Sequence, residues 1–488
     1  MRNHIDNLVR ISCCAVITAL TACGGSSTSH TSASTDATST AATSTATTST
    51  TTSSAAAPTS ASASAATTTS AATTSSAPAT SVLLPSTTTS SSTTSTTAAT
   101  TSSGLSVKVS GNHLVDGSGK TVQLRGVNVS GLETYAVQGW SPNDPWGGQA
   151  PNFTAIKSWG INAIRVPLNE ASWNGGTCVD NGGFSATVVN GNRVQDTPGQ
   201  VINPDPGGNY HAAVAAVVSQ ATAAGLYVIL DLHLTAPGTA CPETQNAMAD
   251  ADHSVTFWSS VAATYKNNAN VIFELFNEPF LDQTSLEDNT PWADLINGHG
   301  TLSSYITQGN PSIVNYTWNN AGMQQMLNAI RAAGANNVIL TSTLAYSSSM
   351  GGWLDNHPTD TLNPSQVGAV WHAYPSSSGS SLVDCIGTAS TCSPADFASV
   401  QGILAAGYPV VITEFGDPIG GSGSPLSQVL LPWADTNGVS YMGWTWDVWP
   451  GVNQFVLITD SSGTPTAGYG TYVKAHYQCR AAGTAVCQ

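Results

Sequence analysis

Residues 271–279 read Val-Ile-Phe-Glu-Leu-Phe-Asn-Glu-Pro, and this stretch decides the fold of the chain. Its first six residues, Val271–Phe276, are almost all apolar, β-branched or aromatic, which is typical of a strand that is buried on both faces. Pro279 ends the run, and the polar Asn277 and Glu278 stand between the strand and the proline. A strand of this kind belongs to a parallel sheet that helices cover.

Seven further segments share this pattern, and helical stretches separate them. The eight predicted strands are Gln123–Val127, Ala163–Pro167, Tyr227–Leu232, Val271–Phe276, Val338–Ser342, Gly368–His372, Val410–Glu414 and Tyr441–Trp446. The predicted helices are Phe153–Trp159, His211–Ala224, His253–Tyr265, Met323–Ala333 and Pro394–Ala406. A short hairpin over Val107–Leu124, turning at Asp116-Gly117, is predicted to precede the first strand. Strands that alternate with helices in this way predict an α/β fold, the (β/α)₈ TIM barrel.

A doubly wound open sheet is the alternative arrangement for these elements. Such a sheet usually carries a Gly-rich phosphate-binding loop after its first strand. The corresponding sequence here, Arg125-Gly126-Val127-Asn128, is not such a loop. The closed barrel is therefore the fold that we expect.

Polar and aromatic side chains stand where the predicted strands end. They are Arg165, Asp231, His233, Asn277, Glu278, His372, Tyr374, Glu414, Trp444, Trp446 and Asp447. In a TIM barrel the carboxyl ends of the strands form the active site. Only 8% of the chain is charged, so this concentration of charge at one face is difficult to explain by packing.

Two of these residues suit the cleavage of a glycosidic bond. In the retaining mechanism one protonated carboxyl group protonates the leaving oxygen, and one ionised carboxylate attacks the anomeric carbon. Glu278 and Glu414 follow the fourth and seventh strands, which lie across the barrel mouth from each other. We expect Arg165 to keep Glu414 ionised, and a negative neighbour to keep Glu278 protonated.

Other strand-end residues suit the binding of a sugar. Asn277, His372 and Tyr374 can hydrogen-bond sugar hydroxyls and the nucleophile, and Trp446 offers a flat apolar face to a pyranose ring. Glu274, four residues before Glu278, is predicted to lie inside the barrel with a structural role.

The strand ends together resemble glycoside hydrolase family 5, the cellulase family. The resemblance covers about residues 107–449 and rests on Leu124-Arg125-Gly126-Val127-Asn128, Ile164-Arg165-Val166-Pro167, Asp231-Leu232-His233, Phe273-Glu274-Leu275-Phe276-Asn277-Glu278-Pro279, Trp371-His372-Ala373-Tyr374 and Ile412-Thr413-Glu414-Phe415-Gly416. It implies that Glu278 is the acid/base and Glu414 the nucleophile. It also implies that the sugar at the cleavage point is surrounded by Arg165, His233, Asn277, His372, Tyr374 and Trp446. No metal or other cofactor is expected.

The resemblance implies a polysaccharide substrate and an endo-β-1,4-glucanase. A β-mannanase or a xyloglucanase of the same fold would share the strand-end residues, so the choice depends on the loops Ser130–Pro151, Asn174–Asn209, Thr235–Asp250 and Phe280–Asn315. Their lengths predict a cleft that binds a chain. A non-catalytic carbohydrate-binding surface lipoprotein is an alternative of another class, but it would have no need of both glutamates.

The region before the predicted barrel has a different composition. Residues 24–104 are almost entirely Ser, Thr and Ala, with hardly a charge or an aromatic ring. Such a tract cannot bury enough apolar surface to offset the entropy of ordering it. We therefore expect a disordered linker over residues 23–104 and a single catalytic domain over residues 105–488.

Residues 1–22 are similar to the signal peptide of a bacterial lipoprotein. Arg2 and Arg10 precede an apolar run, Ile11–Leu20, that is too short to span a bilayer. Leu20-Thr21-Ala22-Cys23 resembles a lipobox, which implies a lipid on Cys23, and the absence of Asp after Cys23 favours the outer membrane. Ordinary secretion is the alternative. The expected membrane contact is this lipid alone, and we expect a monomer.

The cysteines after the linker fit an exported protein. They are Cys178, Cys241, Cys385, Cys392, Cys479 and Cys487. Six cysteines allow 15 pairings, and the sequence alone does not choose among them. Short loops favour Cys385–Cys392 and Cys479–Cys487, which would leave Cys178–Cys241. A zinc site is the rival interpretation, but no CxxC or paired-His spacing supports it.

The charge balance argues against nucleic acid as a partner. The formal net charge is −16, and no stripe of Lys or Arg is present to neutralise phosphates. A neutral sugar polymer requires no such field, so the balance fits a carbohydrate partner.

Overall fold

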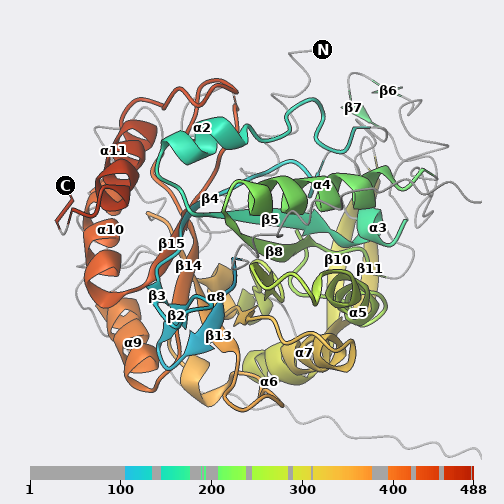
Figure 1. The fold of residues 1–488 in the computed structure, drawn as a ribbon. Helices are drawn as coiled ribbons and strands as arrows, with labels where there is room; N and C mark the ends of the chain where they lie inside the picture. The colour runs from blue at the N-terminus through green and yellow to red at the C-terminus, as the bar shows by residue number, and fades with distance from the viewer. Residues whose placement is uncertain are drawn as a thin grey trace, which may run out of the picture. The chain divides into compact units, whose positions relative to one another are not determined.

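A closed barrel of eight parallel strands forms the centre of the folded part (Figure 1). The computed structural model describes residues 105–134, 144–175, 188–189, 192–193, 207–237, 245–283, 290–308, 312–375, 394–418, 425–449, 455–484 and 486–487. In chain order the barrel strands are β4(Arg125–Asn128), β5(Ala163–Asn169), β8(Tyr227–Leu234), β9(Val271–Glu274), β12(Ile339–Thr341), β13(Val367–Ala373), β14(Val410–Phe415) and β15(Ser440–Gly443). Strand β15 pairs with β4, which closes the ring.

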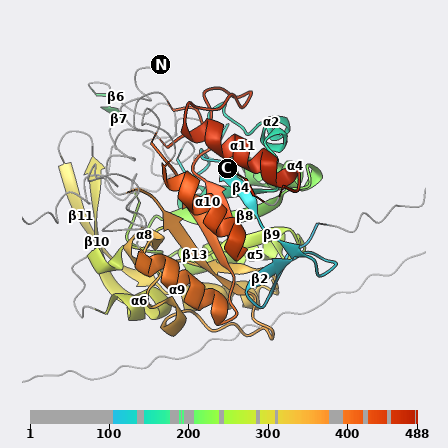
Figure 2. The ribbon, with the colours of Figure 1, turned by 90° about the vertical axis from the view of Figure 1, so that its left-hand side faces the viewer.

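Helices surround this barrel, as Figures 1 and 2 show. They are α2(Phe153–Ser158), α3(Glu170–Trp173), α4(Asn209–Ala223), α5(Ser254–Tyr265), α6(Pro291–Asn297), α7(Met323–Ala332), α8(Leu344–Ser347), α9(Pro394–Ala405), α10(Pro425–Asn437) and α11(Tyr469–Ala481), with short 3₁₀ turns at Leu281–Gln283 and Trp353–Asp355. The barrel strands are buried on both faces because the helices cover the outside and side chains fill the inside.

A small sheet covers the amino-terminal end of the barrel. It consists of β1(Lys108–Ser110), β2(His113–Val115) and β3(Thr121–Val122). Val107, Val109 and Leu114 pack against the lower barrel interior, in one apolar cluster with residues such as Ile272 and Met442. Backbone N–H groups of this segment also bond to residues just before barrel strands, from Val107 to the carbonyl of Ala269 and from Val109 to the side chain of Gln366.

The structure confirms all eight predicted strands and the five predicted helices, with shifted ends. The last strand stops at Gly443 instead of Trp446, and the expected hairpin over Val107–Leu124 is a three-stranded sheet. The segment Phe280–Asn315, interpreted as a loop, contains helix α6 and most of an antiparallel hairpin, β10(Gly298–Gln308) and β11(Ser312–Ala321). In Figure 2 this hairpin and the amino-terminal sheet lie on opposite sides of the barrel.

One of the favoured disulfides is present, between Cys479 and Cys487, with the Cα atoms 5.8 Å apart. The other four cysteines lie outside the described residues. The residues that flank the short strands β6(Val188–Val189) and β7(Asn192–Arg193) lie outside them as well. The signal sequence, Cys23 and the linker lie outside them too. Within the described part of the chain, no helix combines the length and apolarity that a membrane crossing needs.

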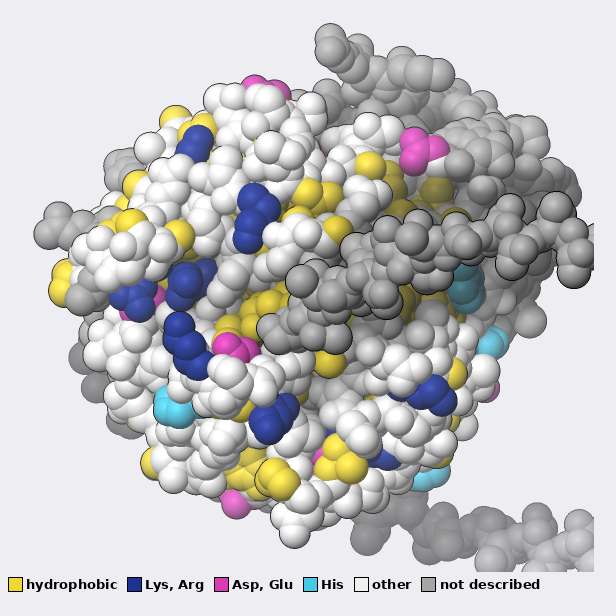
Figure 3. Space-filling model, in the orientation of Figure 1, with side chains coloured by type: hydrophobic (Ala, Val, Ile, Leu, Met, Phe, Trp, Pro, Cys, Tyr) yellow, Lys and Arg dark blue, Asp and Glu magenta, His cyan; other side chains and the backbone are white. Residues whose placement is uncertain are grey.

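The surface carries few charges. On the face that Figure 3 shows, Lys and Arg side chains are interspersed with broad uncharged areas. This appearance follows from a composition with only 8% charged residues.

Gly126 of strand β4 is expected to tolerate no side chain. A Cβ atom there would meet the sulfur of Met442 and lie 2.5 Å from the carbonyl oxygen of Ala163. Gly126→Ala should lower the free energy of unfolding by about 1–3 kcal/mol through overpacking. Gly402→Ala is the matched control: Gly402 is exposed on α9 with open space around it, so the substitution should raise stability by about 0.5–1 kcal/mol. Urea unfolding measures the free energy of unfolding of both variants. Equal changes in Gly126→Ala and Gly402→Ala would contradict the close packing at Gly126.

Candidate active site

Arg165 lies at the centre of the barrel's carboxyl end and is fully buried. Arg165 belongs to strand β5, and its guanidinium reaches toward strands β8 and β9. Its Nε and Nη2 donate to the two oxygens of Glu274, on β9, at 2.9 and 2.8 Å. Nη2 also lies 2.9 Å from Asp231 Oδ2. Burial opposes the positive charge, but these carboxylates and Glu414 outweigh it and hold the pKa of Arg165 well above its ordinary value. Glu274 therefore has the structural role that the sequence predicted.

The same guanidinium orients Glu414 and two asparagines. Nη1 donates to Glu414 Oε1 at 2.7 Å and to Asn128 Oδ1 at 2.9 Å, and Nη2 donates to Asn277 Oδ1 at 2.8 Å. The Tyr374 hydroxyl donates to the other oxygen, Glu414 Oε2, at 2.7 Å. Both oxygens of this buried carboxylate thus accept a hydrogen bond, from Arg165 and Tyr374. Of the other two residues predicted to bond the nucleophile, His372 lies 3.7 Å from Glu414 Oε2 and Asn277 bonds Arg165 instead.

Glu278 follows strand β9 and pairs with His372 of strand β13. His372 Nδ1 lies 2.8 Å from Glu278 Oε1, and Gln245 Nε2 donates to Glu278 Oε2 at 3.2 Å. The other ring nitrogen of His372 lies 3.0 Å from Thr413 Oγ1. Because the Thr413 hydroxyl donates its hydrogen to Glu274 at 3.1 Å, it must accept from His372, so Nε2 carries a hydrogen. A second proton therefore lies between His372 Nδ1 and Glu278.

The charges at this pair differ from the expectation for Glu278. Burial favours neutral His372, but the charge of Glu414, the nearby Glu274 carboxylate and the hydrogen bond to Glu278 outweigh it and raise the pKa of His372 to about 10. Burial likewise raises the pKa of Glu278, yet the hydrogen bond and charge of His372 leave it below its ordinary value. The prediction that a negative neighbour holds Glu278 protonated is wrong, because the cationic imidazole is the closer charge.

A second histidine connects the buried charges to an aromatic ring. His233 Nδ1 donates to Asp231 Oδ2 at 2.7 Å, and Asn277 Nδ2 lies 3.4 Å from its Nε2. Burial and the charge of Arg165 lower the pKa of His233, which fits a neutral ring with its hydrogen on Nδ1. The ring of Trp444 lies nearly parallel to this imidazole, with centroids 5.6 Å apart and an interplanar angle of 8°. Trp444 is partly exposed.

Trp446, the predicted sugar platform, lies elsewhere. Its ring is 4% exposed and packs edge-on against Trp159, which follows helix α2, with centroids 4.8 Å apart. It also borders Gly463. The choice of Trp446 was therefore wrong and Trp444 is the tryptophan that faces the buried charges, because the strand ends at Gly443 and its alternation does not extend to Trp446.

Further residues near Glu278 were missed. Gln245 lies in a loop with no recognisable motif, so no sequence signal could have found it. Phe280 and Tyr346 have stacked rings with centroids 4.8 Å apart, and the charge of Glu278 reaches the Tyr346 hydroxyl. Tyr346 N donates to the carbonyl of Pro279, which joins this aromatic pair to the segment that carries Glu278.

Comparison with known proteins agrees with this geometry. A family model described as cellulase (glycosyl hydrolase family 5) matches residues 115–449. The chain belongs to glycosyl hydrolase family 5. As a family 5 member it carries a glycoside hydrolase domain, and the matched residues include all the strands of the barrel.

Curated relatives of this family 5 chain bear endoglucanase names. It is 27% identical to endoglucanase N of Pectobacterium atrosepticum over 343 residues, which are 70% of this chain and 56% of the relative. It is 24% identical to an endoglucanase of Clostridium saccharobutylicum, over 70% of this chain and 57% of the relative. The chain thus spans little more than half the length of these relatives.

Solved structures similar to the family 5 domain include a β-glucanase of Saccharophagus degradans in complex with cellotetraose. That likeness has 18% identity and a TM-score of 0.48, and covers 78% of this chain and 94% of the other. A β-mannanase of Streptomyces thermolilacinus is similar at 19% identity and a TM-score of 0.46, over 78% of this chain and 98% of the other.

One atom from each of Glu278, His372 and Glu414 lies within 4.8 Å of the other two, a spacing that could hold a metal ion. The hydrogen bonds of this family 5 site argue against that use. Each of the four carboxylate oxygens already has a protein partner, from Arg165, Tyr374, His372 or Gln245. The group is self-sufficient without an ion.

His372 should make folding stability depend on pH. Its folded pKa of about 10 lies above the ordinary value near 6.5, so its stabilising contribution is complete below about pH 6.5 and is lost as the pH rises through about 10. The stability lost in His372→Asn should therefore be largest near about pH 6 and shrink toward about pH 10. Urea unfolding across this range measures it, with His299→Asn, at an exposed histidine, as the control. A loss that is constant with pH would contradict the cationic form.

Proposed function

We propose that this domain is a retaining endo-β-1,4-glucanase, with Glu414 as the nucleophile and Glu278 as the acid/base. The observation that carries the proposal is the closeness of the two carboxylates, which offer oxygens within 4.8 Å of each other. Retaining enzymes hold these groups about 5–5.5 Å apart, whereas inverting enzymes separate them by about 6.5–9.5 Å to admit a water molecule. The short separation favours direct attack by Glu414 on the sugar.

In the first step a Glu414 oxygen attacks the anomeric carbon while the glycosidic bond breaks. Arg165 and Tyr374 hold the carboxylate in place, so its orientation is fixed before the sugar arrives. The leaving oxygen takes a proton from the Glu278–His372 pair, which holds one proton between Nδ1 and Oε1. The products of this step are a glycosyl ester of Glu414 and a sugar chain with a free hydroxyl group.

The attack itself helps to release that proton. The negative charge of Glu414 is the strongest influence that raises the pKa of His372. This charge disappears when Glu414 becomes an ester, so His372 then holds its proton less tightly and can pass it through Glu278. In the second step Glu278 accepts a proton from water, the water oxygen attacks the anomeric carbon, and the bond from that carbon to the Glu414 oxygen breaks, so that Glu414 leaves as a carboxylate.

The sugar at the cleavage point is proposed to contact Asn277 and His233, and Trp444 in place of the predicted Trp446. Asn277 and His233 present polar atoms beside the carboxylates, and the partly exposed Trp444 presents an aromatic face. Glucan is the preferred polymer in this proposal because the curated relatives are named endoglucanases. Mannan and xyloglucan remain outcomes of the test.

The amino-terminal features extend the proposal to location. We propose that residues 1–22 direct export, that Cys23 carries a lipid anchor in the outer membrane, and that residues 23–104 are a linker to a monomeric catalytic domain. The disulfide between Cys479 and Cys487 supports export, because such bonds persist in oxidising compartments.

The direct test is sugar release by the purified protein from carboxymethyl-cellulose, barley β-glucan, glucomannan, galactomannan and xyloglucan. Glu414→Gln and Glu278→Gln should lower turnover on the preferred polymer by roughly three orders of magnitude or more, because each removes one of the two reacting carboxyl groups. Proton NMR of the first product should show the β-anomer, as retention requires. Normal activity in either variant would refute the assignment, and release from a mannan alone would correct the substrate.

Trp444 and Trp446 form a matched pair that tests the sugar platform. Trp444→Ala should raise KM on the order of ten-fold, about 1.4 kcal/mol, with little change in Tm, because this ring is partly exposed beside the carboxylates. Trp446→Ala should lower the free energy of unfolding by about 3–5 kcal/mol, because its ring is buried against Trp159. Kinetics and urea unfolding on both variants separate the two roles. The reverse pattern would restore Trp446 as the platform.

A further inference from the structure

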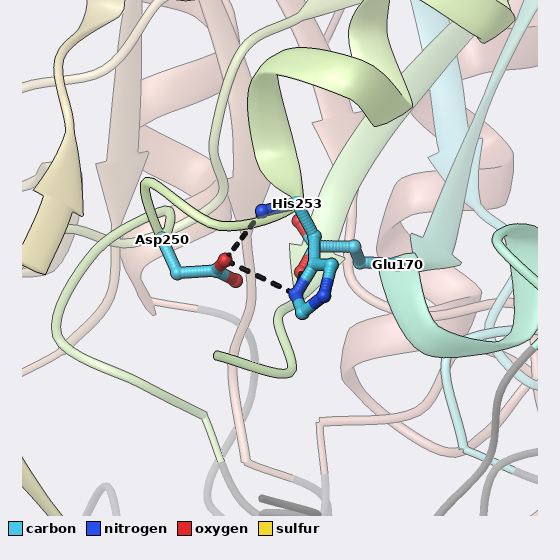
Figure 4. A group of neighbouring side chains, drawn as sticks. All are labelled: Glu170, Asp250 and His253. Atoms are coloured by element: carbon cyan, nitrogen blue, oxygen red, sulfur yellow. Dashed lines mark hydrogen bonds and ion pairs between the residues drawn. The ribbon is translucent and has the colours of Figure 1, made fainter. Parts of the chain in front are cut away.

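A second cluster of side chains that could bind a metal ion contains neither of the two glutamates. Figure 4 shows Glu170, Asp250 and His253 converging from separate elements. Glu170 is the first residue of helix α3, directly after strand β5, and the other two immediately precede helix α5. One ligand atom from each residue lies within 4.8 Å of the other two. Both carboxylates are fully buried, whereas the His253 side chain is 37% exposed.

The hydrogen bonds of this cluster are incomplete. Asp250 Oδ1 accepts from the backbone N–H groups of Asp252 and His253, at 3.1 and 2.8 Å. Asp250 Oδ2 has no hydrogen-bond partner within the described part of the chain, although the whole side chain is buried. Such an orphaned carboxylate oxygen is rare in a folded protein, because its desolvation is not offset. The Glu278–Glu414 site differs, since all four of its oxygens are bonded.

The charges of the cluster are also unbalanced. Glu170 accepts hydrogen bonds from Ala236 N at 3.1 Å and from the Ser254 hydroxyl, both neutral donors. The side chain beside the two carboxylates that can carry a positive charge is His253, whose Nδ1 lies 3.4 Å from Asp250 Oδ1 and 4.0 Å from Glu170 Oε1, too far for a good hydrogen bond. Two buried carboxylates this close need a proton or a cation between them.

We propose that Glu170, Asp250 and His253 bind a divalent transition-metal ion, with Zn²⁺ as the best match. Two carboxylate oxygens and one imidazole nitrogen are ligands that Zn²⁺ accepts, whereas Ca²⁺ and Mg²⁺ prefer oxygen alone. Two ligands of one tetrahedral Zn²⁺ ion stand about 3.4 Å apart. His253 Nδ1 lies 3.4 Å from Asp250 Oδ1 and 4.0 Å from Glu170 Oε1, and the partly exposed His253 can move to close the ligand set around an ion. Water would complete the coordination from the exposed side of that ring.

The ion would join two loops at the carboxyl end of the barrel. Glu170 belongs to the segment after β5, and Asp250 belongs to the segment after β8 that also carries Gln245, the donor to Glu278. The role is structural, because the bound ion would stabilise this end of the molecule without contacting the two glutamates. The inference is therefore independent of the proposed function.

The test measures metal content and thermal stability of the purified protein. After treatment with a chelator and dialysis, the protein should take up about one Zn²⁺ per chain, measured by mass spectrometry of the metal. Saturating Zn²⁺ should raise Tm by about 5 °C. Asp250→Asn should lose both effects, whereas Asp355→Asn, at an exposed aspartate, should keep them. If Asp250→Asn fails to fold, His253→Gln should lower the affinity for Zn²⁺ at least about ten-fold.

Three results would overturn the inference. The first is wild-type protein that takes up no stoichiometric Zn²⁺, which would mean that a shared proton joins the carboxylates. The second is uptake that is the same in wild type, Asp250→Asn and His253→Gln. The third is a larger Tm rise with Ca²⁺ than with Zn²⁺, which would refute the choice of a transition-metal ion.

Discussion

The buried guanidinium of Arg165 is the interaction on which the rest of the site depends. Removing a charge from water is costly, so a cation in the barrel interior requires anions and hydrogen-bond acceptors around it. Glu274, Asp231 and Glu414 supply the charge. These carboxylates in turn have few other positively charged groups near them. Loss of Arg165 would therefore leave buried negative charges unpaired, and loss of a carboxylate would weaken the pairing of Arg165. The position of Glu414 is thus fixed by the same forces that fold the barrel.

This dependence extends to the proton that lies between His372 and the other glutamate, Glu278. Glu274 accepts a hydrogen bond from Thr413, and Thr413 therefore accepts one from His372. The hydrogen on His372 Nε2, and hence the orientation in which Nδ1 faces Glu278, follows from a carboxylate that never approaches the substrate in the proposed mechanism. A residue deep in the barrel can thus control acid–base chemistry at the mouth through two hydrogen bonds.

The sequence was sufficient to predict the barrel because each parallel strand is buried on both faces and must therefore be apolar along its whole length. It was also sufficient to predict that Arg165, Glu278, Glu414, His372 and Tyr374 lie close together, because strand ends in such a barrel meet at one mouth. Prediction from the sequence failed at residues that lie outside the regular repeat of a strand or helix. Gln245 comes from a loop, and Trp446 was preferred to Trp444 although the strand had already ended. The charge state of Glu278 was misjudged because it depends on distances between strands, which sequence spacing does not contain.

For a related reason helix α10 was predicted without bounds, only to end at Gly438, and helix α11 was not predicted. Helix α10 contains Pro432, which normally interrupts a helix. Helix α11 has tyrosines, a histidine and a glycine where a regular apolar stripe would be expected, yet Tyr469, Val473 and Tyr477 are buried against the barrel. Tyr477 even donates a hydrogen bond to the carbonyl of Gly126. These two helices form because of their packing against the barrel and not because of their local sequence pattern.

The small amino-terminal sheet has a practical consequence for anyone who attaches this domain to something else. It seals the end of the barrel from which the strands start, whereas the two glutamates lie at the end where the strands finish. Whatever precedes residue 105 therefore joins the domain at its closed end. A fusion partner, affinity tag or solid support is therefore attached at the end opposite the two glutamates, while the sheet itself must be kept intact because it is the floor of the barrel.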